Sequence, residues 1–222
     1  MKSKSLFFAI AFLFIATTSI AQLTDIDGHQ YKTVKIGTQV WMAENLDVSH
    51  FRNGDPIPES KDWITSEDGK PAWCYYNNEV TNGNKYGRLY NWYAVNDKRG
   101  LAPKGWHIPT DAEWKILINY LGGKNMACSK MKTTNEWHKS TYAPAGINNG
   151  NGTNESGFTG LPAGCRAYDL EFSLLGYNFF WWSSSSNKIA AWSCTMDSND
   201  CSIILADDNF LRDGLSIRCV KD

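Results

Sequence analysis

Six cysteines are the residues of this chain that could form cross-links, hold a metal or do redox chemistry. They are Cys74, Cys128, Cys165, Cys194, Cys201 and Cys219. A structural zinc site needs Cys or His ligands in closely spaced pairs, and the sequence has no Cys-x-x-Cys pair and no Cys/His cluster at such spacing. An even number of cysteines in an exported chain is typical of disulfides. We therefore expect disulfides, with many connectivities open.

One disulfide follows from the local pattern. Residues 197–200 read Asp-Ser-Asn-Asp, which is typical of a turn. They lie between two segments that predict antiparallel strands. Such a hairpin places Cys194 opposite Cys201, and cross-strand Cβ separations of about 4.5–5.5 Å lie just above the disulfide range. We expect a Cys194–Cys201 bond.

Residues for acid–base or nucleophilic catalysis do not form a recognisable motif. No Gly-x-Ser-x-Gly element occurs, and His107 directly precedes a predicted helix cap, where a hydrogen-bonded structural role is expected. Glu44, Glu113 and Glu155 could pair as glycosidase carboxylates, which must lie about 5–10 Å apart. The sequence does not show that distance. We expect no catalytic residues and no cofactor, and metal binding stays open.

Aromatic side chains make up 14% of the chain and are its most prominent candidates for ligand binding. We expect Trp41, Trp92, Trp106 and Trp114, which lie in patterned segments, to be core. Trp181 and Trp182 are adjacent, and successive strand side chains point to opposite faces. One of the two would then be exposed as a stacking platform for a sugar, with Asn154, Glu155 and Arg166 as polar partners. The alternative is plain packing of both rings.

A helix over residues 110–121 is the clearest predicted element. Thr110 and Glu113 form a capping-box pattern after Pro109. Apolar residues follow at helical spacing, namely Trp114, Leu117, Ile118 and Leu121. A second helix is predicted over residues 87–96.

Short strands are predicted at both ends of the chain. Alternating residues over 24–41, with turn signals at Asp27-Gly28 and Gly37-Thr38, predict antiparallel hairpins. Further strands are predicted at 179–183, 190–196, 201–205 and 215–220. Residues 143–165 are dense in Gly, Asn and Pro and predict long irregular loops, which are usually functional or disordered. This order of elements is typical of the α+β class.

Residues 1–21 predict a secretory signal peptide. Two early lysines precede an apolar run over 6–16, and Ser19-Ile-Ala21 resembles a cleavage site. The apolar run is too short to span a bilayer. We expect cleavage near Ala21, a mature single domain over 22–222 without a membrane span, and a secreted, periplasmic or cell-surface location. The net charge of -1, without a basic block, disfavours nucleic acid as a partner, and the oligomeric state stays open.

Several segments resemble one family of exported bacterial proteins. They are Asp25-Ile-Asp-Gly28, Trp41-Met-Ala-Glu-Asn-Leu46, Tyr86-Gly-Arg-Leu-Tyr-Asn-Trp-Tyr-Ala-Val95, residues 101–114, Asn154-Glu-Ser-Gly-Phe158, Leu161-Pro-Ala-Gly164, Trp181-Trp-Ser-Ser184 and Ser216-Ile-Arg-Cys-Val-Lys-Asp222. Together they make the chain similar to the Fibrobacter succinogenes major paralogous domain family over nearly its whole mature length. That family has no settled biochemical activity.

More distantly, residues 107–114 are similar to a segment of the formylglycine-generating enzymes, or sulfatase-modifying factors. This resemblance implies a C-type-lectin-like fold with a mostly antiparallel core, two helices and a long loop region. The copper-binding cysteine pair of those enzymes and the calcium-and-sugar triplets of C-type lectins have no match here, so neither chemistry carries over. Cys74 and Cys219 lie in family-like segments, whereas Cys128 and Cys165 stand where the family has other residues. The resemblance thus implies Cys74–Cys219 and Cys128–Cys165 bonds.

Taken together, we expect an exported, non-catalytic binding or surface-associated protein that recognises a glycan or another cell-surface polymer. The alternatives are an enzyme on a sulfatase-modifying-factor-like scaffold and a purely structural module of the cell surface. Fold does not decide among the three.

Overall fold

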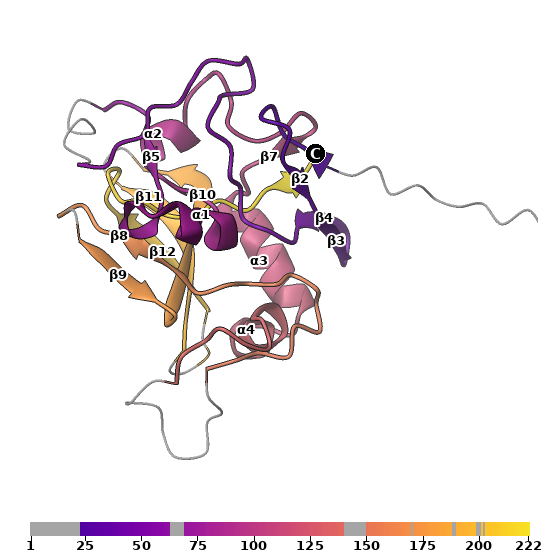
Figure 1. Ribbon diagram of the computed structural model, residues 1–222. Coiled ribbons are helices and arrows are strands. Elements are labelled where there is room, and N and C mark those ends of the chain that lie inside the picture. Colours follow the sequence, from indigo (N-terminus) through magenta and orange to yellow (C-terminus); the bar gives the residue numbers. More distant parts are fainter. Residues whose placement is uncertain are drawn as a thin grey trace, which may run out of the picture.

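The computed structural model describes residues 23–62, 69–139, 150–169, 171–187, 190–198, 201 and 203–222, which form an α+β arrangement (Figure 1). The strands are β1 (Leu23–Thr24), β2 (Gln30–Tyr31), β3 (Thr33–Ile36), β4 (Gln39–Met42), β5 (Trp73–Cys74), β6 (Leu89–Tyr90), β7 (Trp106–His107), β8 (Ala163–Arg166), β9 (Phe172–Leu175), β10 (Asn178–Ser186), β11 (Ala191–Asp197), β12 (Ile203–Asn209) and β13 (Val220–Lys221). The helices are α1 (Val80–Tyr86), α2 (Trp92–Val95), α3 (Asp111–Tyr120) and α4 (Lys124–Met131). The predicted signal peptide lies outside the described residues.

The two ends of the chain meet in one sheet of strand order β3-β4-β13-β7. The β3–β4 hairpin confirms the alternation read over residues 24–41, and its turn has Gly37 at a φ of 62°. A Cβ at Gly37 would lie 2.8 Å from the ring of Tyr120, so glycine also permits the close approach of α3. Strand β13 pairs antiparallel with both β4 and β7.

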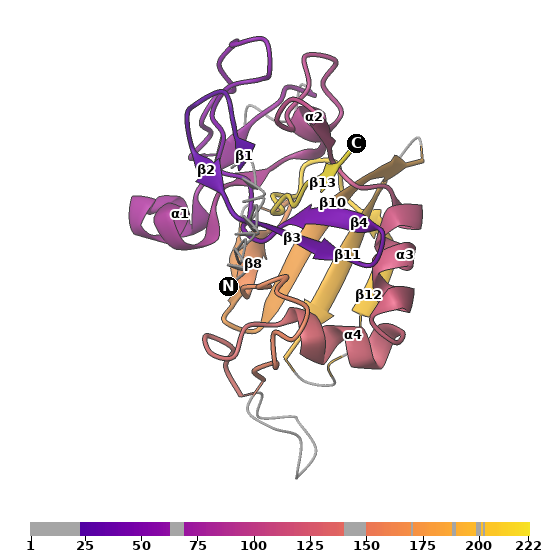
Figure 2. The same ribbon diagram turned by 90° about the vertical axis from the view of Figure 1, so that its right-hand side faces the viewer.

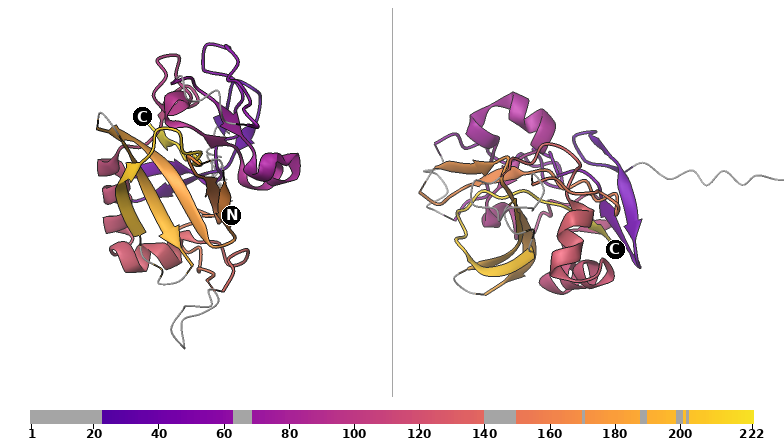
Figure 3. Two further views of the ribbon diagram at one scale, coloured as in Figure 1. Left: turned by 90° about the vertical axis from the view of Figure 1, so that its left-hand side faces the viewer. Right: turned by 90° about the horizontal axis from the view of Figure 1, so that it is seen from below.

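The second sheet has the order β12-β11-β10-β8-β9 and is antiparallel except between β10 and β8. Figures 2 and 3 show α3 and α4 on one face of this sheet. Strand β12 runs beyond the predicted residue 205. Of the strand predicted over 215–220, only Val220 is in a strand. The rest of the segment is buried and makes isolated bridges, such as that of Ser216 with Trp181, without pairing continuously. Strand β8 replaces the end of the predicted loop.

Helix α3 confirms the predicted helix and its capping box. The Thr110 side chain accepts a hydrogen bond from the Glu113 N–H, and the Glu113 carboxylate accepts one from the Thr110 N–H. Trp114, Leu117 and Ile118 are buried, as the apolar stripe predicts. No helix in the described part of the chain is long and apolar enough to cross a membrane.

The helix predicted over 87–96 is only partly correct. Leu89 and Tyr90 form β6, which pairs antiparallel with β5. The Asn91 side chain then accepts a hydrogen bond from the Ala94 N–H and starts the short helix α2. Local apolar spacing cannot show that a distant strand will pair with residues 89 and 90.

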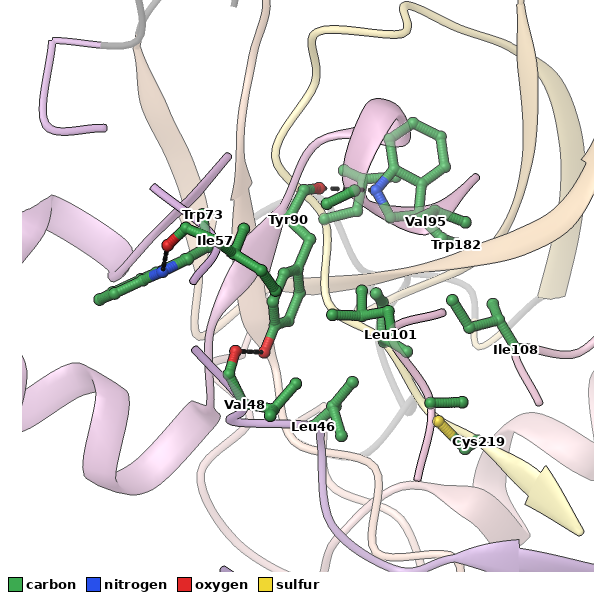
Figure 4. Packing of buried hydrophobic residues seen from close by; sticks show 14 of the residues in the cluster. Leu46, Val48, Ile57, Trp73, Tyr90, Val95, Leu101, Ile108, Trp182 and Cys219 are labelled. Carbon is green, nitrogen blue, oxygen red and sulfur yellow. Dashed lines mark hydrogen bonds between the residues drawn. The ribbon is translucent and has the colours of Figure 1, made fainter. Parts of the chain in front are cut away.

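The core next to α2 contains aromatic rings that donate hydrogen bonds to backbone oxygens (Figure 4). The Trp182 Nε1 donates to the Tyr90 backbone oxygen at 2.7 Å, and the Tyr90 hydroxyl donates to the Val48 oxygen at 2.7 Å. The Trp73 Nε1 donates to the Ile57 oxygen at 2.8 Å. Polar edges of these rings are therefore satisfied inside the core.

Arg218, in the C-terminal segment that resembles the family, is fully buried. Its guanidinium donates to the Asn45 side-chain oxygen and to the backbone oxygens of Met42, Phe158 and Thr159. Burial lowers its pKa to about 9, and no carboxylate in the described part of the chain forms an ion pair with it. Five fixed donors let one side chain join the N-terminal strands, the loop before β8 and the C-terminus.

The disulfide in the structure joins Cys128 of α4 to Cys201, with Cα atoms 5.5 Å apart. The expected Cys194–Cys201, Cys74–Cys219 and Cys128–Cys165 pairings are therefore wrong. Cys194 lies in β11 opposite Leu205 of β12, and Cys74, Cys165, Cys194 and Cys219 are buried free thiols. Cys201 precedes β12 and lies beside the helix rather than across the hairpin, so a contact between distant segments decides the pairing.

Candidate functional site

Two aromatic rings lie in contact on the surface, at one end of the second sheet. The ring centroids of Tyr168 and Phe210 are 4.3 Å apart, and their planes meet at 48°. Tyr168 is 46% exposed and Phe210 is 53% exposed. Single exposed aromatic residues are common on protein surfaces, whereas contiguous apolar patches mark interaction sites. We name this pair the ring platform.

The ring platform is built by two chain reversals. Tyr168 lies in the turn between β8 and β9, and Phe210 directly follows β12. Arg166 and Gly214 exchange two backbone hydrogen bonds, of 2.9 Å and 2.7 Å, and so fasten the two reversals side by side. The rings therefore stand on two turns that directly adjoin strands and are joined by these two backbone bonds.

The carboxylate of Asp213 lies close to the backbones of both rings. It accepts a hydrogen bond from the N–H of Phe210 at 2.9 Å, and the N–H of Tyr168 also favours its charged form. Burial raises the pKa of Asp213 to about 6 against the effect of these two N–H groups, and the nearby carboxylates of Asp169 and Asp208 raise it further. The platform thus has an acidic edge that can accept hydrogen bonds from hydroxyl groups.

Trp181 and Trp182, the predicted stacking residues, are both fully buried, so the expectation of one exposed ring is wrong. Their side chains do point to opposite faces of β10, but both faces are covered. The Trp181 ring stacks on Trp114 of α3, with centroids 5.6 Å apart, and Trp182 contacts Trp92 of α2 edge-on. Neither ring can reach a sugar.

The three predicted polar partners do not line a common binding site with the two tryptophans. The Asn154 side-chain oxygen accepts a hydrogen bond from the Thr159 N–H at 2.8 Å and so shapes its own loop, while Glu155 is exposed. Arg166 is buried, and its guanidinium donates to the backbone oxygens of Ser60 and Lys61. Of the five predicted residues, Arg166 alone supports the ring platform, and it does so through its backbone.

His107 has the structural role that its position before the helix cap predicts. Its Nε2 lies 2.7 Å from a Glu113 carboxylate oxygen and its Nδ1 lies 2.7 Å from an Asp222 carboxylate oxygen. Partial burial lowers the pKa of His107, but its bonds to these two carboxylates outweigh burial and raise it. Glu113 is occupied by the cap and by His107, which leaves it no evident part in glycoside hydrolysis.

Ser49, His50 and Asp27 have the residue types of a catalytic triad without its geometry. Asp27 accepts hydrogen bonds from the Ser49 hydroxyl at 2.8 Å and lies 2.6 Å from His50 Nδ1. The Ser49 oxygen is also 3.1 Å from that same Nδ1. In a triad the serine and the carboxylate contact different ring nitrogens, so this cluster does not activate a nucleophile.

The described residues form no site suited to metal binding or to thiol catalysis. They contain no group of three or more His, Cys, Asp or Glu side chains that could hold a metal ion. Burial raises the pKa of the Cys194 thiol far above its ordinary value, and the pKa of the Cys74 thiol is raised to about 12. Thiols in this state are poor nucleophiles.

Sequence reasoning missed the ring platform because neither ring lies in a patterned segment. Tyr168 and Phe210 are single aromatic residues 42 positions apart in turns. The local signal is the polar sequence around them, which contains Asp169, Asp208 and Asp213.

Comparison with known proteins gives a family but no activity. A family model described as the Fibrobacter succinogenes major domain matches residues 34–221. No curated protein and no solved structure matches the chain. The match covers most of the sequence and includes the strands, helices and loops that build the site. The chain belongs to the Fibrobacter succinogenes major domain family.

Proposed function

We propose that this protein is an exported, non-catalytic binding protein that holds a glycan or another cell-surface polymer on the ring platform. The observation that carries the proposal is the contact between two half-exposed rings, Tyr168 and Phe210, on backbone fixed by Asp213. The apolar C–H face of a sugar stacks on such rings, and its hydroxyl groups bond to carboxylates at the edge.

Preorganisation supports a binding role over an accidental patch. Ordering a surface loop on binding costs free energy that a fixed site avoids. Here the Phe210 turn is closed by the backbone bond from Asp213 N–H to Phe210 oxygen at 2.9 Å, and Arg166 and Gly214 hold the neighbouring turn. The backbone that carries the rings therefore needs little rearrangement when a ligand binds.

Export of the mature chain is part of the proposal. It is supported by the signal-peptide pattern of residues 1–21 and by the Cys128–Cys201 disulfide, since disulfides persist in oxidising compartments. We also propose that the α+β domain is a variant of the C-type-lectin-like fold. The mostly antiparallel five-stranded sheet, the helices α3 and α4, and the pairing of β4 with β13 support that assignment.

The proposal is tested by binding of the mature protein to a glycan array and to insoluble cell-wall polysaccharides. Three proteins are compared: the wild type, the Tyr168→Ala/Phe210→Ala double variant, and Tyr120→Ala as a matched control. Tyr120 is a 65% exposed tyrosine on α3, so its variant removes a similar ring elsewhere. We expect the wild type and the control to bind the same polymer and the double variant to lose it. The proposal would be overturned if all three proteins bound the polymer equally. It would also be overturned if none of them bound any polymer.

A further inference from the structure

A cavity lies between α4 and residues 150–153, and strand β12 separates its residue Cys201 from Phe210 of the ring platform. The cavity has a volume of about 420 Å³ and is lined by Asn125 and Ser129 of α4, by residues 150–153, and by Ser198 and Cys201 after β11. Lys132 and Thr134 complete its wall. Ligand sites for small molecules usually have volumes of about 300–1,000 Å³, so a single sugar ring fits within it.

Glycines allow the loop to lie directly on the helix. A Cβ at Gly152 would come within 2.4 Å of the Ser129 backbone oxygen, and Gly150 has a φ of 77°. The Thr153 N–H donates to the Ser129 oxygen at 2.8 Å, and the Gly152 N–H donates to the Thr133 oxygen at 2.8 Å. The Gly-Asn-Gly sequence that predicted only an irregular loop thus forms one fixed wall of the cavity.

The Cys128–Cys201 disulfide fixes another part of the wall. It ties the middle of α4 to the segment that precedes β12, and Cys201 itself lines the cavity. The cavity is therefore held in shape by a covalent bond as well as by backbone hydrogen bonds. Such a frame favours a defined ligand shape.

The chemistry of the wall is that of neutral hydrogen bonding. Hydroxyl groups come from Ser129, Thr134, Thr153 and Ser198, and amide groups come from Asn125 and Asn151. Among the described residues that line the cavity, Lys132 has the only charged side chain. Its ammonium donates to the Asp197 backbone oxygen and lies 4.1 Å from the centre of the Trp137 ring. The charge of Lys132 therefore has partners within the protein.

Ser198 is the group that points to a ligand. The residue is only 3% exposed, and its hydroxyl oxygen is buried without a hydrogen-bond partner in the described part of the chain. A buried hydroxyl without a partner costs free energy and calls for an explanation. A ligand hydroxyl in the cavity would supply the missing partner.

We infer that this cavity binds a single neutral polyhydroxylated ring, such as a monosaccharide or the end residue of a neutral glycan. The site is separate from the ring platform and does not depend on it. The platform would contact the face of a polymer, whereas the cavity would hold one residue.

The inference is tested by titrating ¹⁵N-labelled mature protein with neutral hexoses, an N-acetylhexosamine, a uronic acid and sorbitol, with amide shifts as the readout. We expect saturable shifts of residues 150–153 and of the Asn125 side-chain amide with a neutral sugar and none with the uronic acid. Ser198→Ala should weaken this binding about three- to tenfold without lowering the melting midpoint, because it removes a hydroxyl that is unpaired in the free protein. Asn125→Ala should weaken binding similarly, and Lys124→Ala, which changes an exposed neighbour on α4, should leave it unchanged.

Failure of this site is distinguishable from failure of the platform. The Tyr168→Ala/Phe210→Ala variant should bind the monosaccharide as the wild type does, and Ser198→Ala should bind polymer through its rings. Absence of shifts at the cavity with every neutral sugar, or wild-type affinity in both Ser198→Ala and Asn125→Ala, would overturn the inference.

Discussion

Asp213 and Phe210 are joined by two reciprocal hydrogen bonds. The Phe210 N–H donates to the Asp213 carboxylate and the Asp213 N–H donates to the Phe210 backbone oxygen, each at 2.9 Å. Because the same carboxylate is also stabilised by the nearby Tyr168 N–H, one partly buried side chain interacts with both turns of the platform. The proposed binding site thus depends on a group whose charge costs free energy.

That cost predicts a pH dependence. The pKa of Asp213 is raised by burial from 3.8 to about 6, so the folded state holds this proton more tightly than the unfolded state. The stability contributed by the group is fully present below about pH 4 and is lost as the pH rises through 6. Asp213→Asn stays neutral, so its free energy of unfolding relative to wild type should increase from pH 4 to pH 6.

Urea denaturation at several pH values measures this difference. Asp207→Asn, which removes an exposed carboxylate of β12, is the matched control and should show no comparable trend. A difference between Asp213→Asn and wild type that is flat across this range, or that shrinks with rising pH, would show that the carboxylate is not destabilised in the fold.

Leu117 tests the packing of α3 against the second sheet. The residue is fully buried, whereas its neighbour Ile116 is 50% exposed. Leu117→Ala should lower the free energy of unfolding by roughly 2–5 kcal/mol because it leaves a cavity in the core, and Ile116→Ala should change it by less than about 0.5 kcal/mol. Chemical denaturation of both variants measures these two values. Similar losses of stability in the two variants would show that the buried face of α3 is assigned wrongly.

The disulfide predicts one covalent link between α4 and the segment before β12. Non-reducing peptide mapping should find the Cys128 peptide bound to the Cys201 peptide. Its loss in Cys128→Ala/Cys201→Ala should cost about 4 kcal/mol in the chain-entropy model for a separation of 73 residues. Detection of Cys194 in a disulfide instead would contradict the pairing and the frame of the cavity between α4 and residues 150–153.

Arg218 predicts a severe defect from a single substitution far from the proposed site. Arg218→Ala leaves the backbone oxygens of Phe158 and Thr159 without their donor, while the Asn45 side-chain oxygen keeps only its bond from Trp181 Nε1. A buried acceptor left without a donor costs about 1–3 kcal/mol, so the two should cost about 2–6 kcal/mol together. Lys221→Ala, at an exposed cation of β13, is the control. A loss below about 1 kcal/mol in Arg218→Ala would mean that water replaces the guanidinium.

Local motifs predicted the parts of the fold that depend on local chemistry. The Thr110–Glu113 capping box and the stripe at Trp114 and Leu117 predicted α3 correctly, because the first turn and the apolar face of a helix are specified within a few residues. The hairpin of β3 and β4 followed from turn residues in the same way. The α+β class followed from the order of these elements.

Relationships between distant segments could not be predicted in this way. The alternation rule correctly assigned Trp181 and Trp182 to opposite faces, but only the folded chain shows that α3 covers one face and α2 the other. The disulfide depends on where α4 lies relative to Cys201. The ring platform depends on Asp213, whose place in a polar segment of the sequence gives no sign that its carboxylate is partly buried and bonds to the Phe210 turn.

The most direct test of a binding function is the affinity of single ring variants for the polymer that the wild type retains. Affinity gel electrophoresis at increasing polymer concentration gives the dissociation constants of wild type, Phe210→Ala, Tyr168→Ala and the Tyr120→Ala control. Removal of an anchoring aromatic residue at an interface costs about 1–2 kcal/mol or more, so each platform variant should bind at least about fivefold more weakly, with the control unchanged. Dissociation constants for Phe210→Ala and Tyr168→Ala within a factor of two of the wild type would contradict the proposed function.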